Sequence, residues 1–215
     1  MPIISISCHS VNPHDAQEVY YKAVTCLRPR DLPCIYCDHP ITHSHGSYKR
    51  QPYTFNGELM LWDIHRRECQ NTDCGRTFAI LPDILAPYAR YLIIIQDMAT
   101  THLAEGKSYD QTADFLESYG LAPSESTVRR WYERALNQSE QLLPKLSSIL
   151  QNQVPERKLP PLRRQVRSPS LCLYYDLLGL LGGIHSGTWN ILRLIVCMFA
   201  PSVSEDRVSY GLSPG

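Results

Sequence analysis

The sequence predicts an α+β fold that is mainly α, in which a small cysteine-bearing sheet precedes a three-helix unit and C-terminal apolar helices. Short alternating runs, spotted with glycine and aromatic residues, occupy 33–82 and are typical of strands. Apolar residues at helical spacing follow over 87–151, and a strongly apolar stretch spans 171–200. The composition, 43% hydrophobic and 20% charged, is that of a globular protein with one or two small domains.

The N-terminal segment 1–32 is expected to hold one short strand and one helix. The run "PIISIS" is rich in β-branched residues and favours a strand. In the following helix Asn12 is the predicted N-cap, Pro13 suits the first helical position, and Asp15 lies near the positive helix end. This segment has neither a basic start nor a long apolar run, so we expect no signal peptide and a cytoplasmic, reducing location.

Two cysteine pairs within 33–82 have the spacing of a zinc ribbon. The first pair has the pattern C-x2-C and the second C-x4-C, and each short turn can supply two soft ligands to a tetrahedral Zn²⁺. Gly75, directly after the second pair, suits a left-handed turn, and Asp38 holds the equivalent place after the first pair. We therefore expect one structural Zn²⁺ site, made by Cys34, Cys37, Cys69 and Cys74.

Other interpretations of these thiols are less favourable. A thioredoxin-type redox pair at Cys34 and Cys37 would leave the second pair without a role. The run "PCIYC" also matches half of the zinc deaminase signature, but the H-x-E half is absent. Four cysteine ligands leave no position for water, so we expect no catalysis and no enzyme. The intervening histidines are not needed as ligands and are expected to be polar surface or DNA-facing residues: His39, His43, His45 and His65.

The cysteines outside the two pairs lack partner spacing. They are expected to be small buried apolar residues. They are Cys8, Cys26, Cys172 and Cys197.

Residues 87–151 carry the pattern of a helix-turn-helix. One helix is expected to begin near Ser108, and Gly120 is expected to end it in a left-handed conformation. Ser124 is the predicted cap of the next helix. The apolar face of the first helix is predicted to contain Ala113, Leu116 and Tyr119, and that of the second Val128, Trp131 and Tyr132.

The other faces of the second helix carry candidate DNA contacts. Arginine can bind guanine through two hydrogen bonds, and hydroxyl side chains can contact bases or phosphate. The candidates are Ser126, Thr127, Arg129 and Arg130. The alternative is an ordinary three-helix core whose arginines are simply solvated, since a motif alone is only a hypothesis.

The run "HRRECQNTDCGRTFAILPDILAPYARY", followed by "SYDQTADFL" and "SESTVRRW", resembles the N-terminal DNA-binding part of bacterial insertion-sequence transposases. It is also similar to short bacterial proteins of unknown function that share this region. The resemblance covers about residues 30–136 and implies double-stranded DNA as the partner. It implies zinc binding by the four paired cysteines and recognition-helix contacts by the four residues named above. The residues after 136 are too few for the catalytic domain of those transposases, so strand transfer is not implied.

Basic residues near the cysteines and in a later segment offer further DNA contacts. The formal net charge is zero, so nucleic-acid binding has to depend on local patches. Three arginines beside the second pair are candidate phosphate contacts: Arg66, Arg67 and Arg76. Residues 152–170 form a basic, proline-rich linker that is either solvated or aligned along phosphates.

The apolar stretch 171–200 is expected to form helices that pack on the protein, on a second copy or on a transposase partner. Charged residues and glycines interrupt it, so no membrane span is expected. Residues 201–215 are expected to be a flexible tail. The first hypothesis is a non-catalytic, zinc-stabilised DNA-binding protein derived from or associated with a mobile element. The alternative is a protein-interaction adaptor with a structural zinc ribbon.

Overall fold

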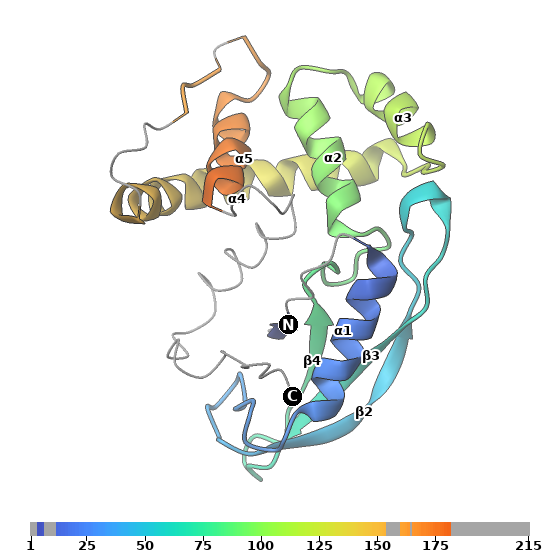
Figure 1. Cartoon of the computed structure of the whole chain (residues 1–215), viewed down its shortest axis with the longest axis vertical. Helices are drawn as coiled ribbons and strands as arrows, with labels where there is room; N and C mark the ends of the chain where they lie inside the picture. Colours follow the sequence, from blue (N-terminus) through green and yellow to red (C-terminus); the bar gives the residue numbers. More distant parts are fainter. Residues whose placement is uncertain (1–3, 7–11, 154–159, 164, 182–215) are drawn as a thin grey trace, which may run out of the picture.

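The computed structural model describes residues 4–6, 12–153, 160–163 and 165–181, and it confirms an α+β fold that is mainly α. Figure 1 shows a helical layer above a sheet with one helix on its side. The elements are β1 (Ile4–Ile6), α1 (Pro13–Cys26), β2 (Thr42–Arg50), the short helix η1 (Phe55–Gly57), β3 (Trp62–Cys69), β4 (Thr77–Pro82), α2 (Ile93–Ala104), α3 (Tyr109–Glu117), α4 (Glu125–Gln153) and α5 (Pro169–Leu181).

The sheet has the strand order β1-β4-β3-β2. Strand β3 pairs antiparallel with both β2 and β4, whereas β1 pairs with β4 in parallel. The parallel pair includes Ile4 opposite Ile80, so the predicted N-terminal segment completes the same sheet as the predicted ribbon. The division of the chain into separate domains stays a prediction.

Helix α1 lies beside the sheet and is attached to β3 and β4 by tyrosine hydroxyls. The hydroxyl of Tyr20 donates to the Ile80 carbonyl at 2.9 Å and accepts from the His65 backbone N–H at 2.9 Å. The hydroxyl of Tyr21 accepts from the Asp63 N–H at 2.8 Å. β4 pairs with β3 only from Arg66 to Glu68, so the two hydroxyls accept from backbone N–H groups of β3 that β4 does not reach.

The predicted start of α1 is confirmed, because Asn12 Oδ1 accepts from the His14 N–H at 2.9 Å and Pro13 follows. The prediction for the remaining cysteines holds only in part. Cys172 is buried, as expected, but Cys26 is exposed, because it ends α1 on the face away from Tyr20. Cys8 and Cys197 lie outside the described residues.

The helical layer contains the predicted helix-turn-helix segments, α3 and α4, joined by residues 118–124. Ser108 caps α3 in a capping box with Gln111, and Gly120 has the expected positive φ of 69°. The predicted inward residues of α4 are all buried: Val128, Trp131 and Tyr132.

The predicted apolar face of α3 is wrong at two of its three positions. Leu116 is buried, but Ala113 and Tyr119 are exposed, and Thr112 takes the second buried place. The helix ends at Glu117, so Tyr119 lies beyond it and packs its ring on Phe115 at 5.3 Å instead.

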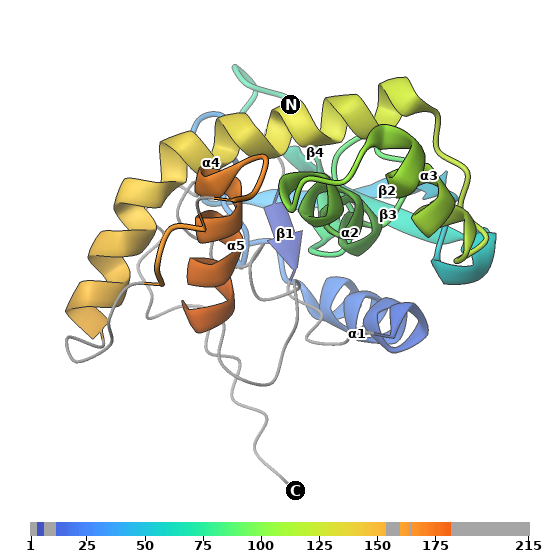
Figure 2. The same ribbon diagram turned by 90° about the horizontal axis from the view of Figure 1, so that it is seen from above.

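Helix α4 is the longest element and crosses the whole helical layer, with α5 beside it (Figure 2). Helix α5 packs on α4 and α2, which confirms the expected packing for 171–181. The rest of the apolar stretch, residues 154–159 and 164 of the predicted linker, and the predicted tail lie outside the described residues. None of the helices that the structure describes is long and apolar enough to span a membrane.

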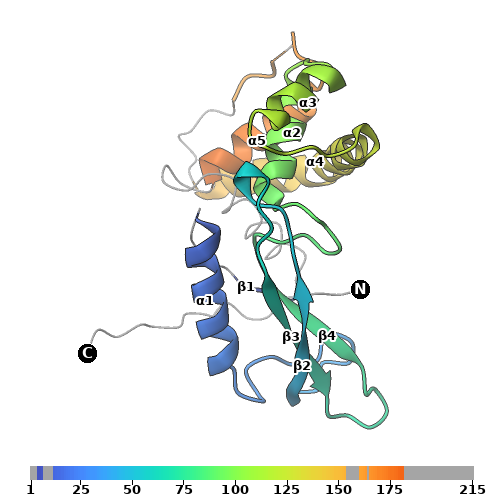
Figure 3. The same ribbon diagram turned by 90° about the vertical axis from the view of Figure 1, so that its right-hand side faces the viewer.

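The turn between β2 and β3 reaches up to the turn between α3 and α4 (Figures 1 and 3). A Cβ atom on Gly57 would lie 2.2 Å from the carbonyl oxygen of Gly120, so the two backbones are in direct contact. Beside this contact the rings of Tyr53 and Tyr91 stack at 5.0 Å, and Tyr91 meets Trp131 edge-on at 5.3 Å. The sheet and the helical layer therefore touch at a point where side chains are excluded.

We expect Gly57→Ala to lower the free energy of unfolding more than Gly46→Ala. Both glycines have positive φ, so each alanine adds about 1–2 kcal/mol of backbone strain. Only the alanine at Gly57 also meets backbone, at Gly120, which adds about 1–3 kcal/mol, whereas Gly46 has open space around it. Urea unfolding of both variants measures the difference. Equal losses would show that the contact between the two turns has no energetic weight.

Candidate functional site

The first cysteine pair lies on a tight turn between α1 and β2. The Asp38 N–H donates to the Cys34 carbonyl at 2.8 Å, and the Cys34 N–H donates to the His39 carbonyl at 2.9 Å. Asp38 has a φ of 55°, as expected for the residue after the pair. This turn directs the Tyr36 N–H towards the sulfur of Cys34, at 3.4 Å.

The second pair repeats this arrangement between β3 and β4. The Cys69 N–H donates to the Arg76 carbonyl at 3.0 Å, and the Asn71 N–H points at the sulfur of Cys69, at 3.4 Å. Gly75 has a φ of 51°, matching Asp38 in the first turn. Two turns with the same backbone pattern therefore face each other across the end of the sheet.

The two turns bring the four predicted cysteine sulfurs together, all within 4.8 Å of one another. Cys34 Sγ lies 3.8 Å from Cys74 Sγ, and Cys37 Sγ lies 3.6 Å from Cys69 Sγ. Zn–S bonds of about 2.3 Å in a tetrahedron would place sulfurs about 3.8 Å apart, whereas a disulfide needs about 2.05 Å. The geometry and the donor set therefore fit a metal ion such as zinc and exclude disulfides between these pairs.

The surroundings of the sulfurs differ in how they affect ionisation. The backbone N–H of His39 lowers the pKa of the Cys37 thiol. Burial raises the pKa of the free Cys69 thiol to about 12, and hydrogen bonds from the three other cysteines add to this rise. Thiolates this close repel each other, so a bound divalent cation is needed to hold all four ionised.

Residues 34–131 match the family model of a domain of unknown function, DUF6431. The match begins at the first metal-site cysteine and ends at Trp131 in α4, so this DUF6431 domain contains both cysteine turns, all of α3 and the first two turns of α4. No curated protein and no solved structure matches the chain. The resemblance to transposases therefore stays a prediction.

None of the histidines of the described chain joins the cluster in the DUF6431 domain, in line with the expectation that cysteines suffice. His43 is exposed, and His45 lies 3.0 Å from Glu68 in an exposed pair. His65 is not a simple surface residue, because its ring packs near the rings of Tyr20 and Tyr21.

The three arginines predicted beside the second pair have different surroundings. Arg67 is buried, and its guanidinium donates to the Arg28 carbonyl at 2.9 Å and to the carbonyl and hydroxyl oxygens of Thr42 at 2.6 and 2.9 Å. The prediction that Arg67 contacts phosphate is therefore wrong, since β3 turns this side chain inward. Arg66 donates to the Thr77 hydroxyl at 2.6 Å and Arg76 lies over the ring of Tyr36, so both stay near the surface.

The four residues predicted on the helix-turn-helix lie together at the start of α4. Ser126, Arg129 and Arg130 are exposed and line a shallow hollow, and Thr127 is half-buried beside them. Arg129 pairs with Glu125 at 2.9 Å. Arg130 reaches back to the Thr127 hydroxyl at 3.2 Å.

The metal-site end of the DUF6431 domain and the start of α4 are at opposite ends of the molecule. Figure 3 shows the two cysteine turns below the sheet, while α3 and α4 lie above it. The structure therefore does not bring Arg66 and Arg76 together with Arg129 and Arg130. The two groups form separate candidate surfaces.

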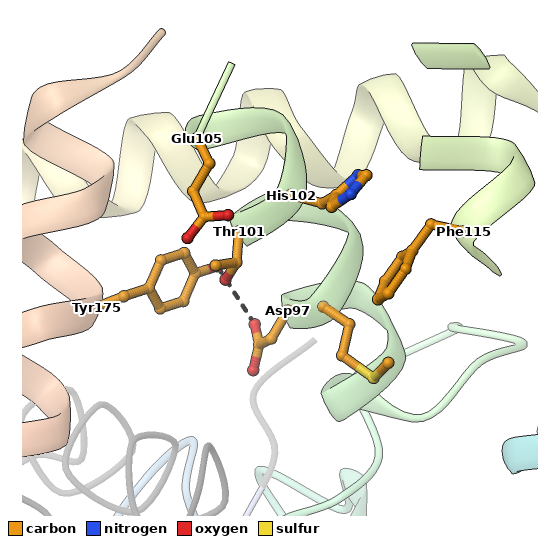
Figure 4. Close-up of a pocket in the computed structure, with 7 residues that line it drawn as sticks. Asp97, Thr101, His102, Glu105, Phe115 and Tyr175 are labelled. Atoms are coloured by element: carbon orange, nitrogen blue, oxygen red, sulfur yellow. Dashed lines mark hydrogen bonds between the residues drawn. The ribbon is translucent and has the colours of Figure 1, made fainter. Parts of the chain in front are cut away.

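A half-buried acid on α2 that the sequence did not indicate lies at a hollow lined by residues of α2, α3 and α5 (Figure 4). Asp97 borders a hollow, but its Oδ2 atom is buried and has no hydrogen-bond partner among the described residues. Its Oδ1 atom accepts from the Tyr175 hydroxyl at 3.4 Å, and that hydroxyl lies 2.6 Å from the Thr100 hydroxyl. Burial raises the pKa of Asp97 from 3.8 to about 8. No local pattern marks Asp97, because its burial depends on α5, which comes much later in the chain.

We expect Cys34→Ser to abolish stoichiometric zinc binding and to destabilise the sheet strongly. Metal binding contributes folding free energy on the order of 10 kcal/mol in small domains, and a hydroxyl is a poor replacement for a thiolate. Elemental analysis of the purified protein and thermal unfolding with and without a chelator measure both effects. Cys26→Ser is the matched control, because Cys26 is exposed and outside the cluster. Full zinc content in Cys34→Ser would contradict the four-cysteine site.

We expect Asp97→Asn to stabilise the protein at alkaline pH and to lose this advantage in acid. The raised pKa means that the folded protein binds a proton that the unfolded chain releases, so wild-type stability falls as pH rises between about 4 and 8. Asparagine carries no charge at any of these pH values and keeps an acceptor for Tyr175. Thermal unfolding across this pH range measures the difference. The exposed Asp114→Asn is the control, and a parallel pH trend in both variants would contradict the role of burial at Asp97.

Proposed function

We propose that the protein is a non-catalytic, zinc-stabilised protein that binds double-stranded DNA through the start of α4. The observation that carries this proposal is the exposed polar face formed by Ser126, Arg129 and Arg130 on the first two turns of a long helix. A short helix and a turn precede it, which is the order of elements in a helix-turn-helix.

The chemistry of this face suits a duplex. The N-terminus of α4 favours an anion, because its first backbone N–H groups point outwards. Two adjacent arginines supply forked donors for phosphate or guanine, and the hydroxyl of Ser126 adds a neutral donor. The pair between Arg129 and Glu125 is exposed, so it contributes little to stability and can exchange for phosphate.

The buried face of α4 holds the proposed DNA-binding face in a fixed orientation. Val128, Trp131 and Tyr132 are buried against the helical layer and fix which side of α4 faces outwards. Flanking helices α2 and α3 pack on this face, so the arginines project from a fixed surface rather than from a loop.

The proposed role of zinc is structural. Four cysteine ligands complete a tetrahedron and leave no position for water or substrate. The cluster is also remote from α4 (Figure 3), so a direct zinc contribution to DNA contacts is not part of the proposal. The sequence resemblance supports a derivation from a mobile element. The use of paired cysteines supports a cytoplasmic, reducing location.

We also propose that the C-terminal apolar segment binds a partner, either a second copy of the protein or a transposase. Its described portion, α5, packs on α2 and α4. The alternative function as an adaptor would rest on residues 182–200, which lie outside the described chain.

We expect the wild-type protein with bound zinc to shift duplex DNA in a gel, and Arg129→Ala with Arg130→Ala to weaken that binding at least tenfold. Each lost charged contact removes roughly 1–3 kcal/mol of affinity. Fluorescence anisotropy with duplexes selected from a random pool measures affinity and preference. Lys22→Ala, on the exposed face of α1, is the control. Absence of wild-type duplex binding at low salt would overturn the proposal and favour the adaptor.

A further inference from the structure

Two arginines from distant parts of the chain lie over one tyrosine ring beside the start of α4. The guanidinium carbons of Arg129 and Arg167 lie 5.2 and 5.3 Å from the centre of the Tyr109 ring. Arg167 also lies 5.5 Å from the centre of the Tyr132 ring. Tyr109 begins α3, Arg129 is on α4, and Arg167 directly precedes the segment that starts α5.

The position of Arg167 is fixed by its neighbours, although the sequence predicts at this point a linker that is either solvated or aligned along phosphates. The backbone N–H of Ser168 donates to the Ala104 carbonyl at 3.2 Å, and the Ser168 hydroxyl bonds to the Tyr132 hydroxyl. Ser168 is buried, so the chain just after Arg167 is held against the end of α2 and against Tyr132 of α4. The guanidinium of Arg167 itself remains exposed.

This arrangement leaves a cation without a matching anion. The face of the Tyr109 ring attracts each guanidinium, but Arg129 and Arg167 carry like charges that repel each other. Glu125 offsets the charge of Arg129, whereas the hydrogen bond of Arg167 within the described residues goes to the Lys107 carbonyl, at 3.5 Å. Within the described residues no carboxylate forms an ion pair with Arg167. A bound anion would relieve this repulsion.

A nearby arginine shows the contrast. Arg163, from the same stretch of chain, lies 2.8 Å from Asp176 and 3.9 Å from Glu105. Its charge is therefore already compensated by protein carboxylates.

We propose that Arg167, together with Arg129 and Tyr109, binds a backbone phosphate of the same duplex that the start of α4 contacts. This inference rests on the proposed function and adds a contact from outside the DUF6431 match, which ends at residue 131. Phosphate contacts position a protein on DNA without reading its sequence. Arg167 is accordingly a positioning contact, while Arg129 lies on the helix that faces the bases.

The experiment compares the salt dependence of duplex binding for three single variants. Arg167→Gln removes the charge but keeps a long side chain that packs on Tyr132. Arg167→Lys keeps the charge, and Arg163→Gln is the matched control. Anisotropy titrations of a labelled mixed-sequence duplex, between about 50 and 200 mM salt, give the slope of log affinity against log salt.

Loss of one phosphate contact should make this slope shallower by about 0.9 in Arg167→Gln. The affinity should fall equally for preferred and mixed sequences. Arg167→Lys and Arg163→Gln should keep the wild-type slope. An unchanged slope in Arg167→Gln, while the wild type binds duplex, would overturn this inference and leave the proposed function intact. Failure of the wild type to bind duplex would overturn both.

A second measurement uses the unmodified protein and does not depend on how the variants fold. Phenylglyoxal modifies exposed arginines, and mass spectrometry reports the extent at each position. With saturating duplex, Arg167 should be protected and Arg163 should react as before. Equal reaction of Arg167 with and without duplex would overturn the phosphate contact.

Discussion

The meeting of four cysteine sulfurs at one end of the sheet is the constraint on which the ribbon depends. Strand β2 is one of the two edge strands, and its residues 43–49 are all exposed, so apolar burial does little to hold it. Its position depends on the ladder with β3 and on the two cysteine turns. A cation shared by the four sulfurs would convert mutual repulsion of thiolates into attraction, and its binding energy would become folding energy.

The hairpin of β2 and β3 connects the cysteine cluster at one end to the helical layer at the other. The turn after β2 places Gly57 against Gly120, and the rings of Tyr53, Tyr91 and Trp131 form a continuous contact from the sheet to α4. This hairpin is therefore one route by which a metal site remote from α4 can influence the orientation of the proposed DNA-binding face. The cysteine cluster that would stabilise the sheet and the proposed DNA-binding face on α4 therefore lie at opposite ends of the molecule (Figure 3).

The helical layer is completed by segments that follow this domain. Helix α5 buries Leu171, Leu177 and Leu178 against the layer, while Tyr175 binds Thr100 and Asp97. A partly satisfied buried carboxyl lowers stability when it ionises, so this contact adds a pH-dependent term to a largely apolar interface. The same segment carries Arg167 to the start of α4, which links the packing of α5 to the charge of the proposed DNA-binding surface.

The sequence by itself determined the features that depend on neighbouring residues. The Asn12 cap, the left-handed positions at Asp38, Gly75 and Gly120, and the cysteine spacing all follow from local backbone chemistry. The tertiary structure alone decided which side chains are buried and which charges meet. Arg67 turned inward, Cys26 outward, and Arg167 joined Arg129 on Tyr109, because packing between elements distant in sequence selects these contacts.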